Sequence, residues 1–261
     1  AWRSTDKGAT FTKISSAVFP QARQYFGCVA ISATEIYAFG GRSNLDVYEA
    51  HNDIRVSVDA GANFTTVDHT ACGASPPMWI GRDHLSFTYM PLRQRTVISG
   101  GESSDDPYTF HNDVWYSDDN CTCWTQAKAD INIAVDGFQG AVLVTVPFLS
   151  VEALLLLGGW FKDATFRNTV RLSVDGGLTW SLVASVITVP WSGRRDHTVV
   201  VDTRFSRLLL WGGIHTFGRN AELWTTPLDS IFATLAAAHH QYVAPFAAFT
   251  AICNGGTFCR V

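Results

Sequence analysis

Short apolar runs that stop at a pair of glycines recur along the chain. The pairs are Gly40-Gly41, Gly100-Gly101, Gly158-Gly159 and Gly212-Gly213, at intervals of 60, 58 and 54 residues. The runs before them occupy residues 36–39, 96–99, 154–157 and 208–211. Such a short run before a glycine is typical of a buried strand, because glycine permits a positive φ or a close backbone approach. The spacing therefore predicts a repeated β unit.

A second strand begins at an asparagine after each glycine pair, and in the first three units a polar turn follows five residues later. A further copy of this turn lies at the start of the chain. The repeated turn positions are Ser4, Asp6, Gly8, Ser57, Asp59, Gly61, Ser117, Asp119, Ser173, Asp175, Gly177 and Trp180. An aspartate in a tight hairpin accepts backbone N–H groups, glycine takes the left-handed position, and the closing aromatic ring fills the space between sheets. We interpret the turn as structural.

An arginine marks the first strand of three units. Arg23, Arg82 and Arg195 precede the glycine pairs by 17, 18 and 17 residues. This distance leaves room for one strand, a turn and the strand that ends in glycine. The third unit lacks the arginine near residues 136–140 but has the right length. Each unit thus holds four short strands.

These patterns resemble two known families. The apolar run before Gly-Gly, the Asn-Asp-apolar-aromatic strand and the downstream tryptophan are similar to kelch repeats, as in kelch proteins and the galactose oxidase propeller. The Ser-x-Asp-x-Gly-x-Thr-Trp turns resemble the Asp boxes of sialidases. The resemblance covers nearly the whole chain and implies an all-β propeller of four-stranded antiparallel blades. In sialidase-like folds it also implies that Asp boxes lie on the outer rim, away from the active site.

The number of units predicts five blades in a single domain, residues 1–261. Four blades carry a glycine pair, and a fifth combines a half-blade at the start of the chain with residues 240–256, which echo residues 23–41. Such sharing closes a ring without a free sheet edge. Residues 229–238 could form the outer strand of the fourth blade or a short helix. Residues 250–261 either close the last blade or begin a further cysteine-rich module similar to an EGF-like domain.

Composition narrows the class of protein. With 47% hydrophobic and 16% charged residues the chain should be globular. A net charge of -4 with 19 lysines and arginines gives no electrostatic footprint for nucleic acid. The longest apolar runs, residues 151–160 and 230–238, fall short of the roughly 20 residues of a membrane span. We expect a soluble protein with no membrane span.

Six cysteines and two acceptor triplets favour a secreted protein with disulfides. The cysteines are Cys28, Cys72, Cys121, Cys123, Cys253 and Cys259, and the triplets begin at Asn63 and Asn120. Buried free cysteines and chance triplets also occur in cytosolic proteins. We expect Cys253 to pair with Cys259, and Cys28 with Cys72. Cys121 and Cys123 would then form a strained local bridge or have separate partners. No cysteine and histidine spacing predicts a metal site.

A catalytic role has little support in the residues. A sialidase needs three converging arginines, which Arg23, Arg82 and Arg195 could supply near the axis, together with acids such as Asp83 and Asp196. The alternative is that these arginines bind backbone carbonyls as part of the repeat, as in kelch blades. His84 and His197 are further candidates on the axial face, but they and Tyr25 and Tyr242 show no spacing for copper ligands.

A binding function requires fewer specifically placed residues than catalysis. The loops after each glycine pair vary, and two of them are acidic, which suits a basic partner or calcium and also a solvated surface. We therefore expect no catalytic residues and no cofactor, and an extracellular binding or structural propeller that engages a protein or glycan or assembles with like subunits. The alternative is a sialidase-like hydrolase that acts on glycans.

Overall fold

The computed structural model describes residues 2–14, 19–20, 22–43, 49–72, 78–103, 109–128, 138–148, 151–183 and 189–231. Within these ranges the fold is all-β and consists of several small antiparallel sheets. Residues 228–231 are helical, so the start of segment 229–238 forms a helix and not a strand. A short 3-10 helix, η1 (Thr70–Cys72), lies between sheets 1 and 2 in the sequence. No helix among the described residues is long and apolar enough to cross a bilayer.

Four sheets, here numbered 1 to 4, carry the repeated units. Each runs in chain order from its first strand outward, and all neighbours are antiparallel. Sheet 1 comprises β4 (Gly27–Ala30), β5 (Ile36–Phe39), β8 (Ile54–Ser57) and β9 (Thr65–Thr66). Sheet 2 comprises β10 (Ser86–Met90), β11 (Arg95–Ser99), β14 (Val114–Ser117) and β15 (Thr125–Lys128). Sheet 3 comprises β17 (Val142–Phe148), β18 (Val151–Leu157), β20 (Val170–Ser173) and β21 (Ser181–Leu182). Sheet 4 comprises β22 (Thr198–Asp202), β23 (Arg207–Trp211) and β26 (Leu223–Pro227).

Smaller ladders lie beside the glycine pairs. They are formed by β3 (Arg23–Gln24), β6 (Arg42–Ser43) and β7 (Glu49–Ala50), by β12 (Glu102–Ser103) and β13 (Thr109–Phe110), by β16 (Phe138–Gln139) and β19 (Trp160–Phe161), and by β24 (Ile214–His215) and β25 (Gly218–Arg219). An N-terminal hairpin of β1 (Trp2–Arg3) and β2 (Thr12–Lys13) stands apart from them. The glycine pairs that separate the two kinds of ladder all have positive φ, between 66° and 110°.

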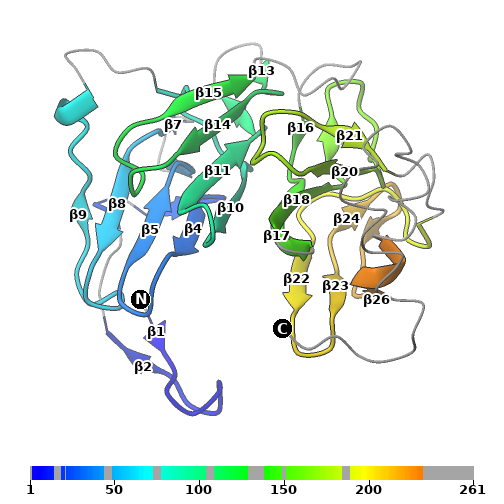
Figure 1. Cartoon of the computed structure of the whole chain (residues 1–261), viewed down its shortest axis with the longest axis horizontal. Coiled ribbons are helices and arrows are strands. Elements are labelled where there is room, and N and C mark those ends of the chain that lie inside the picture. Colours follow the sequence, from blue (N-terminus) through cyan, green and yellow to red (C-terminus); the bar gives the residue numbers. More distant parts are fainter. Residues whose placement is uncertain are drawn as a thin grey trace.

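The four sheets follow one another around an arc (Figure 1). Their first strands β4, β10, β17 and β22 contact one another in that order and face the middle of the arc. The N-terminal hairpin lies on the open side, below sheet 1. The described sheets do not close into a ring.

Three apolar clusters fill the spaces between successive sheets. Between sheets 1 and 2 lie Phe39 and Trp79, between sheets 2 and 3 lie Val97 and Leu154, and between sheets 3 and 4 lie residues such as Leu155. Because alternate residues of a strand point to opposite faces, β11 and β18, which lie within sheets 2 and 3, contribute residues to the clusters on both of their sides. The core thus holds the first strands side by side along the inner side of the arc.

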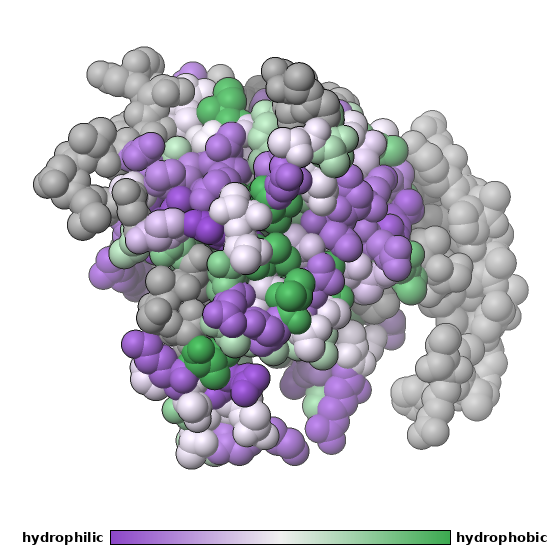
Figure 2. Space-filling model, turned by 90° about the vertical axis from the view of Figure 1, so that its left-hand side faces the viewer, coloured by the Kyte–Doolittle hydropathy of each residue, from purple (hydrophilic) through white to green (hydrophobic). Residues whose placement is uncertain are grey.

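The side of the molecule that carries sheet 1 and the N-terminal hairpin is largely polar. Figure 2 views the side of sheet 1 and the N-terminal hairpin and shows hydrophobic residues as separate small groups among hydrophilic ones. The first strands begin on the opposite, inner side of the arc.

Candidate functional site

One backbone position recurs just before the first strand of each unit. Tyr25, His84, Gly140 and Asp196 occupy it, with φ values of 56°, 47°, 62° and 54°. The N–H of His84 donates to the carbonyl of Tyr25 over 3.2 Å, that of Gly140 to His84 over 2.9 Å, and that of Asp196 to Gly140 over 2.8 Å. These bonds link the four units directly. We call the four residues the axial chain.

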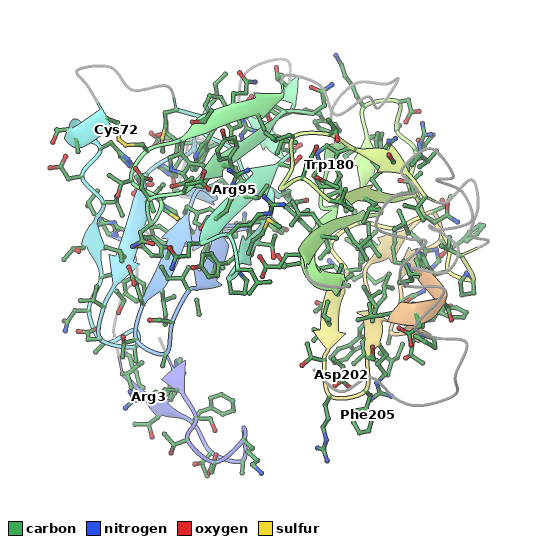
Figure 3. The ribbon with its side chains drawn as sticks, viewed as in Figure 1. Arg3, Cys72, Arg95, Trp180, Asp202 and Phe205 are labelled. Atoms are coloured by element: carbon green, nitrogen blue, oxygen red, sulfur yellow. A yellow bond between two sulfur atoms is a disulfide. The ribbon has the colours of Figure 1, made fainter. Side chains whose placement is uncertain are left out.

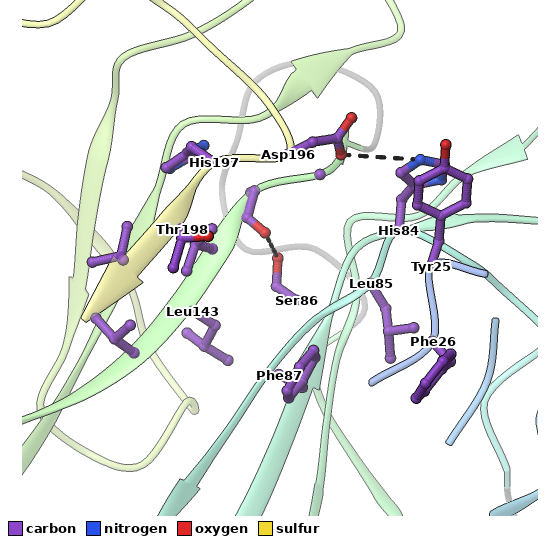
Figure 4. A pocket seen from close by; sticks show the side chains of 15 residues that line it. Tyr25, Phe26, His84, Leu85, Ser86, Phe87, Leu143, Asp196, His197 and Thr198 are labelled. Atoms are coloured by element: carbon purple, nitrogen blue, oxygen red, sulfur yellow. Dashed lines mark hydrogen bonds and ion pairs between the residues drawn. The ribbon is translucent and has the colours of Figure 1, made fainter. Parts of the chain in front are cut away.

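Gly140 leaves space inside the axial chain. A Cβ at this position would overlap Oδ1 of Asp196 and would lie 3.0 Å from Cβ of Arg195. Without it, the Asp196 carboxylate reaches toward His84, and Oδ1 lies 4.0 Å from Nε2 (Figure 4). The glycine therefore brings side chains of the second and fourth units together.

His84 belongs to a cluster of charged side chains. Its Nδ1 lies 2.9 Å from Oδ1 of Asp83 and 3.7 Å from Oε1 of Glu102. Nε of Arg42 lies 3.3 Å from Oδ2 of Asp83. The ring of Tyr25 stacks on the imidazole at 3.7 Å between centroids. Asp83 is fully buried and only 7% of the His84 side chain is exposed, so the cluster is largely desolvated.

Two carboxyl groups of the cluster have perturbed acidity. Burial, and then the charge of Asp83, raises the pKa of Glu102. Burial raises the pKa of Asp196 despite the nearby His84 and Arg195, whose Nε lies 3.4 Å from the Asp196 carboxylate. Desolvation disfavours the charged form of each group. Both carboxylates would therefore be stabilised by an additional positive charge.

Asp83, His84 and Glu102 also place potential ligand atoms within 4.8 Å of one another, as a metal site would. The guanidinium of Arg42 stands beside both carboxylates, at 3.3 Å and 3.9 Å. A metal ion would have to displace this positive charge. The three residues suit an internal ion-pair network better than a metal centre.

A cavity of about 430 Å³ opens beside the axial chain. His84, Asp196, Tyr25 and Phe26 line its mouth, and the first strands supply apolar walls such as Leu143 (Figure 4). An apolar cavity with a few convergent polar groups is the usual form of a binding site. We call this region the axial mouth.

The repeated arginines do not point free guanidinium groups into this cavity. Arg82 donates to the carbonyls of Ile80 and Gly100 and forms a two-pronged ion pair with Asp113. Arg23 binds the carbonyl of Gly40 and pairs with Asp53 in the same way. The side chains of Arg82 and Arg23 are 1% and 6% exposed. We call this arrangement the arginine clamp.

The clamp of the fourth unit corrects the alignment made from spacing. Arg194, and not Arg195, donates to the carbonyl of Gly212 and pairs with Glu222. Arg195 instead pairs with Ile214 in a β-bridge and lies over the ring of Trp160 at 4.6 Å. The adjacent arginines made the register ambiguous by one residue. With Arg194 in place, Asp196 rather than His197 matches His84.

His197 lines the cavity wall but is 5% exposed. Its ring packs against Gly158 of the third unit, just as Leu85 of the second unit packs against Gly40 of the first. Neither ring nitrogen has a hydrogen-bond partner among the described residues. Burial, and then the charge of Arg194, lowers its pKa to about 3. His197 is thus a buried, neutral side chain in the wall of the cavity.

The repeated Ser-x-Asp turns lie at hairpins whose residues do not line the cavity. Asp59 accepts the N–H of Asn63 over 2.9 Å, and the N–H of Gly61 donates to Ser57 Oγ over 2.8 Å. The same bonds recur at Ser4, Asp6, Gly8, Ser173, Asp175 and Gly177, and in part at Ser117 and Asp119. Trp180 closes its turn with Nε1 bonded to the carbonyl of Gly177 (Figure 3).

The cysteine pairing differs from the expectation. Cys72 pairs with Cys123, so the expected bridge between Cys28 and Cys72 is wrong, as is a local bridge between Cys121 and Cys123. Cys28 and Cys121 are free thiols. The reason is spatial: η1, which contains Cys72, reaches the turn between β14 and β15 (Figure 3), and Cys72 Sγ also lies 3.3 Å from the Thr122 carbonyl. Cys253 and Cys259 lie outside the described residues.

The residues missed by sequence reasoning were those that only the fold brings together. Arg42 and Glu102 begin the two acidic loops after the first and second glycine pairs, and nothing in the sequence connects them with His84, yet they lie beside it. A signal existed in the spacing, because Tyr25, His84 and Asp196 precede their glycine pairs by 15, 16 and 16 residues.

Comparison with known proteins adds no family: the sequence matches no protein-family model and no curated protein.

Proposed function

We propose that this chain is an extracellular binding propeller whose ligand occupies the axial mouth, and that it catalyses no reaction. One observation carries the proposal. Each repeated arginine is engaged by its own unit, whereas the aromatic and charged groups of Tyr25, His84 and Asp196 border an open cavity. A sialidase would need the arginines free to converge on a substrate carboxylate. The arginine clamp therefore counts against the hydrolase.

The propeller itself is part of the proposal. Four sheets around an axis, Asp-box turns and the kelch-like glycine pairs agree with four blades. Among the described residues, two surfaces have no neighbouring sheet packed against them. On sheet 4, Trp211 pairs with Leu223, and they are 60% and 64% exposed together with the nearby Val200 at 50%. The N-terminal hairpin exposes Trp2 and Phe11 at 65% and 61%.

A fifth blade would cover both surfaces. Its outer strands would be β1 and β2, and its inner strands would come from residues 240–256, which lie outside the described residues. The opposite face of sheet 4, including Leu208 and Leu210, is fully packed against sheet 3, so the exposed face is the one that continues the ring. The resemblance to kelch and Asp-box propellers supports the same closure.

Two observations support an extracellular location. A disulfide between Cys72 and Cys123 is typical of an oxidising compartment. Asn63 and Asn120, the proposed glycosylation sites, are both exposed. Mass spectrometry of the protein secreted from eukaryotic cells tests this part, because glycans on these two asparagines are the expected result.

The binding function is tested by a ligand screen with one variant. We expect ligand-observed NMR with a panel of soluble glycans and short peptides to find a binder that Tyr25→Asn weakens, since asparagine tolerates the left-handed backbone of this position. Phe217→Ala removes a fully exposed aromatic ring as the control. Fluorogenic sialosides and other glycosides should not be hydrolysed. Turnover that Asp196→Asn abolishes would establish the enzyme instead.

A further inference from the structure

The hydrogen bond between His84 and Asp83 fixes what the imidazole offers to a ligand. A carboxylate only accepts hydrogen bonds, so Nδ1, at 2.9 Å from Asp83, carries the proton. In the neutral ring Nε2 is then an acceptor. Nε2 makes no hydrogen bond within the described part of the chain, although the side chain is more than nine-tenths buried. It faces Asp196 across the space that Gly140 leaves (Figure 4).

Two acceptors therefore converge at the axial mouth. Oδ1 of Asp196 and Nε2 of His84 are 4.0 Å apart, too far for a hydrogen bond between them and close enough to share one donor group. A hydroxyl brings a single proton and satisfies one of the two. An ammonium or guanidinium brings several N–H donors and no acceptor. The pair of acceptors therefore fits a ligand with a nitrogen cation.

The charges and the aromatic ring agree with a cation. Three carboxylates, Asp83, Glu102 and Asp196, face two guanidinium groups, those of Arg42 and Arg195, so the cluster carries an excess negative charge when His84 is neutral. The ring of Tyr25, stacked on His84, belongs to a residue that is 44% exposed and borders the cavity. The guanidinium of Arg42 already lies over this ring, 4.9 Å from its centroid, so the cluster holds one cation against the ring before any ligand binds.

We infer that the axial mouth binds the cationic side chain of a basic peptide, a lysine ammonium in the first place, between Asp196 and Nε2 of His84. The inference rests on the proposed binding function and names the chemical class of the ligand. The stem of the side chain leaves the mouth along Tyr25 and Phe26, which are the exposed aromatic residues of the cavity.

The experiment uses the full chain and a fluorescein-labelled peptide Gly-Ser-Gly-Lys-Gly amide, followed by anisotropy at low salt. The wild type should bind the lysine peptide, and the same peptide with acetyllysine should bind at least about tenfold more weakly, because acetylation removes the charge and leaves one N–H donor. Free butylamine as competitor separates recognition of the ammonium alone from recognition of a peptide side chain.

Asp196→Asn should weaken binding by about tenfold or more, since it removes the charged acceptor and asparagine still tolerates φ near 54°. Asp118→Asn is the matched control, because it removes an exposed carboxylate that pairs with Arg95 away from the mouth. It should change the affinity less than twofold. Binding should also weaken as the pH is lowered, and at a higher pH than ordinary carboxylates would cause, because burial raises the pKa values of Asp196 and Glu102.

Equal binding of the lysine and acetyllysine peptides, or equal losses in the two aspartate variants, would overturn the inference. If the lysine peptide fails while another ligand binds in a manner that depends on Tyr25, the ligand class is wrong and the proposed binding function stands. If nothing binds at the axial mouth, both fall.

Discussion

His197 shows how a single residue of the repeat departs from its neighbours. It packs on Gly158 in the position where Leu85 packs on Gly40, yet it carries two polar nitrogens into a site without hydrogen-bond partners among the described residues. Leaving such groups unsatisfied costs free energy. The ring avoids a buried charge by remaining neutral, with its pKa lowered to about 3 from 6.5.

We expect His197→Leu to flatten the dependence of stability on pH. Between pH 6.5 and about 3 the unfolded chain binds a proton at His197 that the folded chain excludes, so wild-type stability falls as the pH falls through this window. The slope is about 1.4 kcal/mol per pH unit. Urea unfolding at pH 6, 5 and 4 measures it, with His215→Leu as the control. Parallel curves for wild type and His197→Leu would contradict the assignment.

Gly140→Ala should disturb the axial mouth more than its backbone strain explains. A methyl group would overlap the Asp196 carboxylate, and φ is 62°. Gly8→Ala is the control, because Gly8 also has a positive φ of 87° but nothing lies within 4 Å of its Cβ position. We expect a loss of roughly 1 kcal/mol for Gly8→Ala and 2–3 kcal/mol for Gly140→Ala in urea unfolding. Equal losses would mean that Asp196 moves aside without cost.

The two kinds of left-handed position differ in how well the sequence predicts them. The glycine pairs were predictable, because positive φ strongly selects glycine and the pairs recur at a fixed place. The axial chain was not, because Tyr25, His84, Gly140 and Asp196 share a backbone conformation and no side-chain type. Their left-handed φ is maintained by hydrogen bonds between units, which local propensity does not encode.

At the scale of elements, the arginine clamp joins the first strand of a unit to its glycine pair and its third strand. Sheet 3 lacks the arginine, and Thr169 stands where Asp113 follows the asparagine of sheet 2. Arginine and acid are thus absent together, as expected if each is unfavourable alone. A buried charge without its partner costs far more than the pair contributes.

Arg82→Ala should therefore destabilise the protein by about 3–5 kcal/mol, because it leaves Asp113 buried without its counter-ion. Arg95→Ala breaks an ion pair whose acid, Asp118, is 49% exposed, and should cost about 1 kcal/mol or less. Thermal unfolding of both variants at neutral pH makes the comparison. A similar small loss in both would show that the clamp contributes no more than a surface ion pair.

The disulfide joins two segments that lie far apart in the sequence. Cys72 and Cys123 are 51 residues apart and link η1 to the turn between β14 and β15. A cross-link over this distance restricts the unfolded chain, so Cys72→Ser with Cys123→Ser should cost about 2–4 kcal/mol. Cys28→Ser, which removes a free exposed thiol, should be close to neutral in the same urea unfolding series. A neutral double variant would place these residues in a region that unfolds separately.

The positions of the long strands were easier to predict from the sequence than the pairings between distant segments. Apolar runs before glycine pairs marked β5, β11, β18 and β23, because most residues of these central strands are buried, although β23 ends in the exposed Trp211. The disulfide was not predictable, since cysteine spacing says nothing about which loops the sheets bring together. The small ladders such as β12 with β13 were also missed, because two-residue strands leave no periodic pattern.

At the scale of the whole molecule, the exposed aromatic residues of the N-terminal hairpin are the feature that five blades would explain. Trp124 and Trp180 close their Ser-x-Asp turns with 2% and 8% exposure, whereas Phe11, the closing residue of the first turn, is 61% exposed. The sequence repeats the turn at its start, and the described residues supply no inner strands beside it. Those strands must come from residues beyond 231 if the ring closes.

Phe11→Ala separates a closed ring from an isolated hairpin. In a closed ring Phe11 packs between blades, and its removal should cost about 3 kcal/mol, as truncation of a buried phenylalanine does. Phe217→Ala, the same substitution at a residue that is 93% exposed, should change stability by less than about 0.5 kcal/mol. Urea unfolding followed by circular dichroism gives both values. If the two variants behave alike, the hairpin is uncovered in solution and the fifth blade does not form, whereas a large loss only for Phe11→Ala requires a covering segment from the rest of the chain.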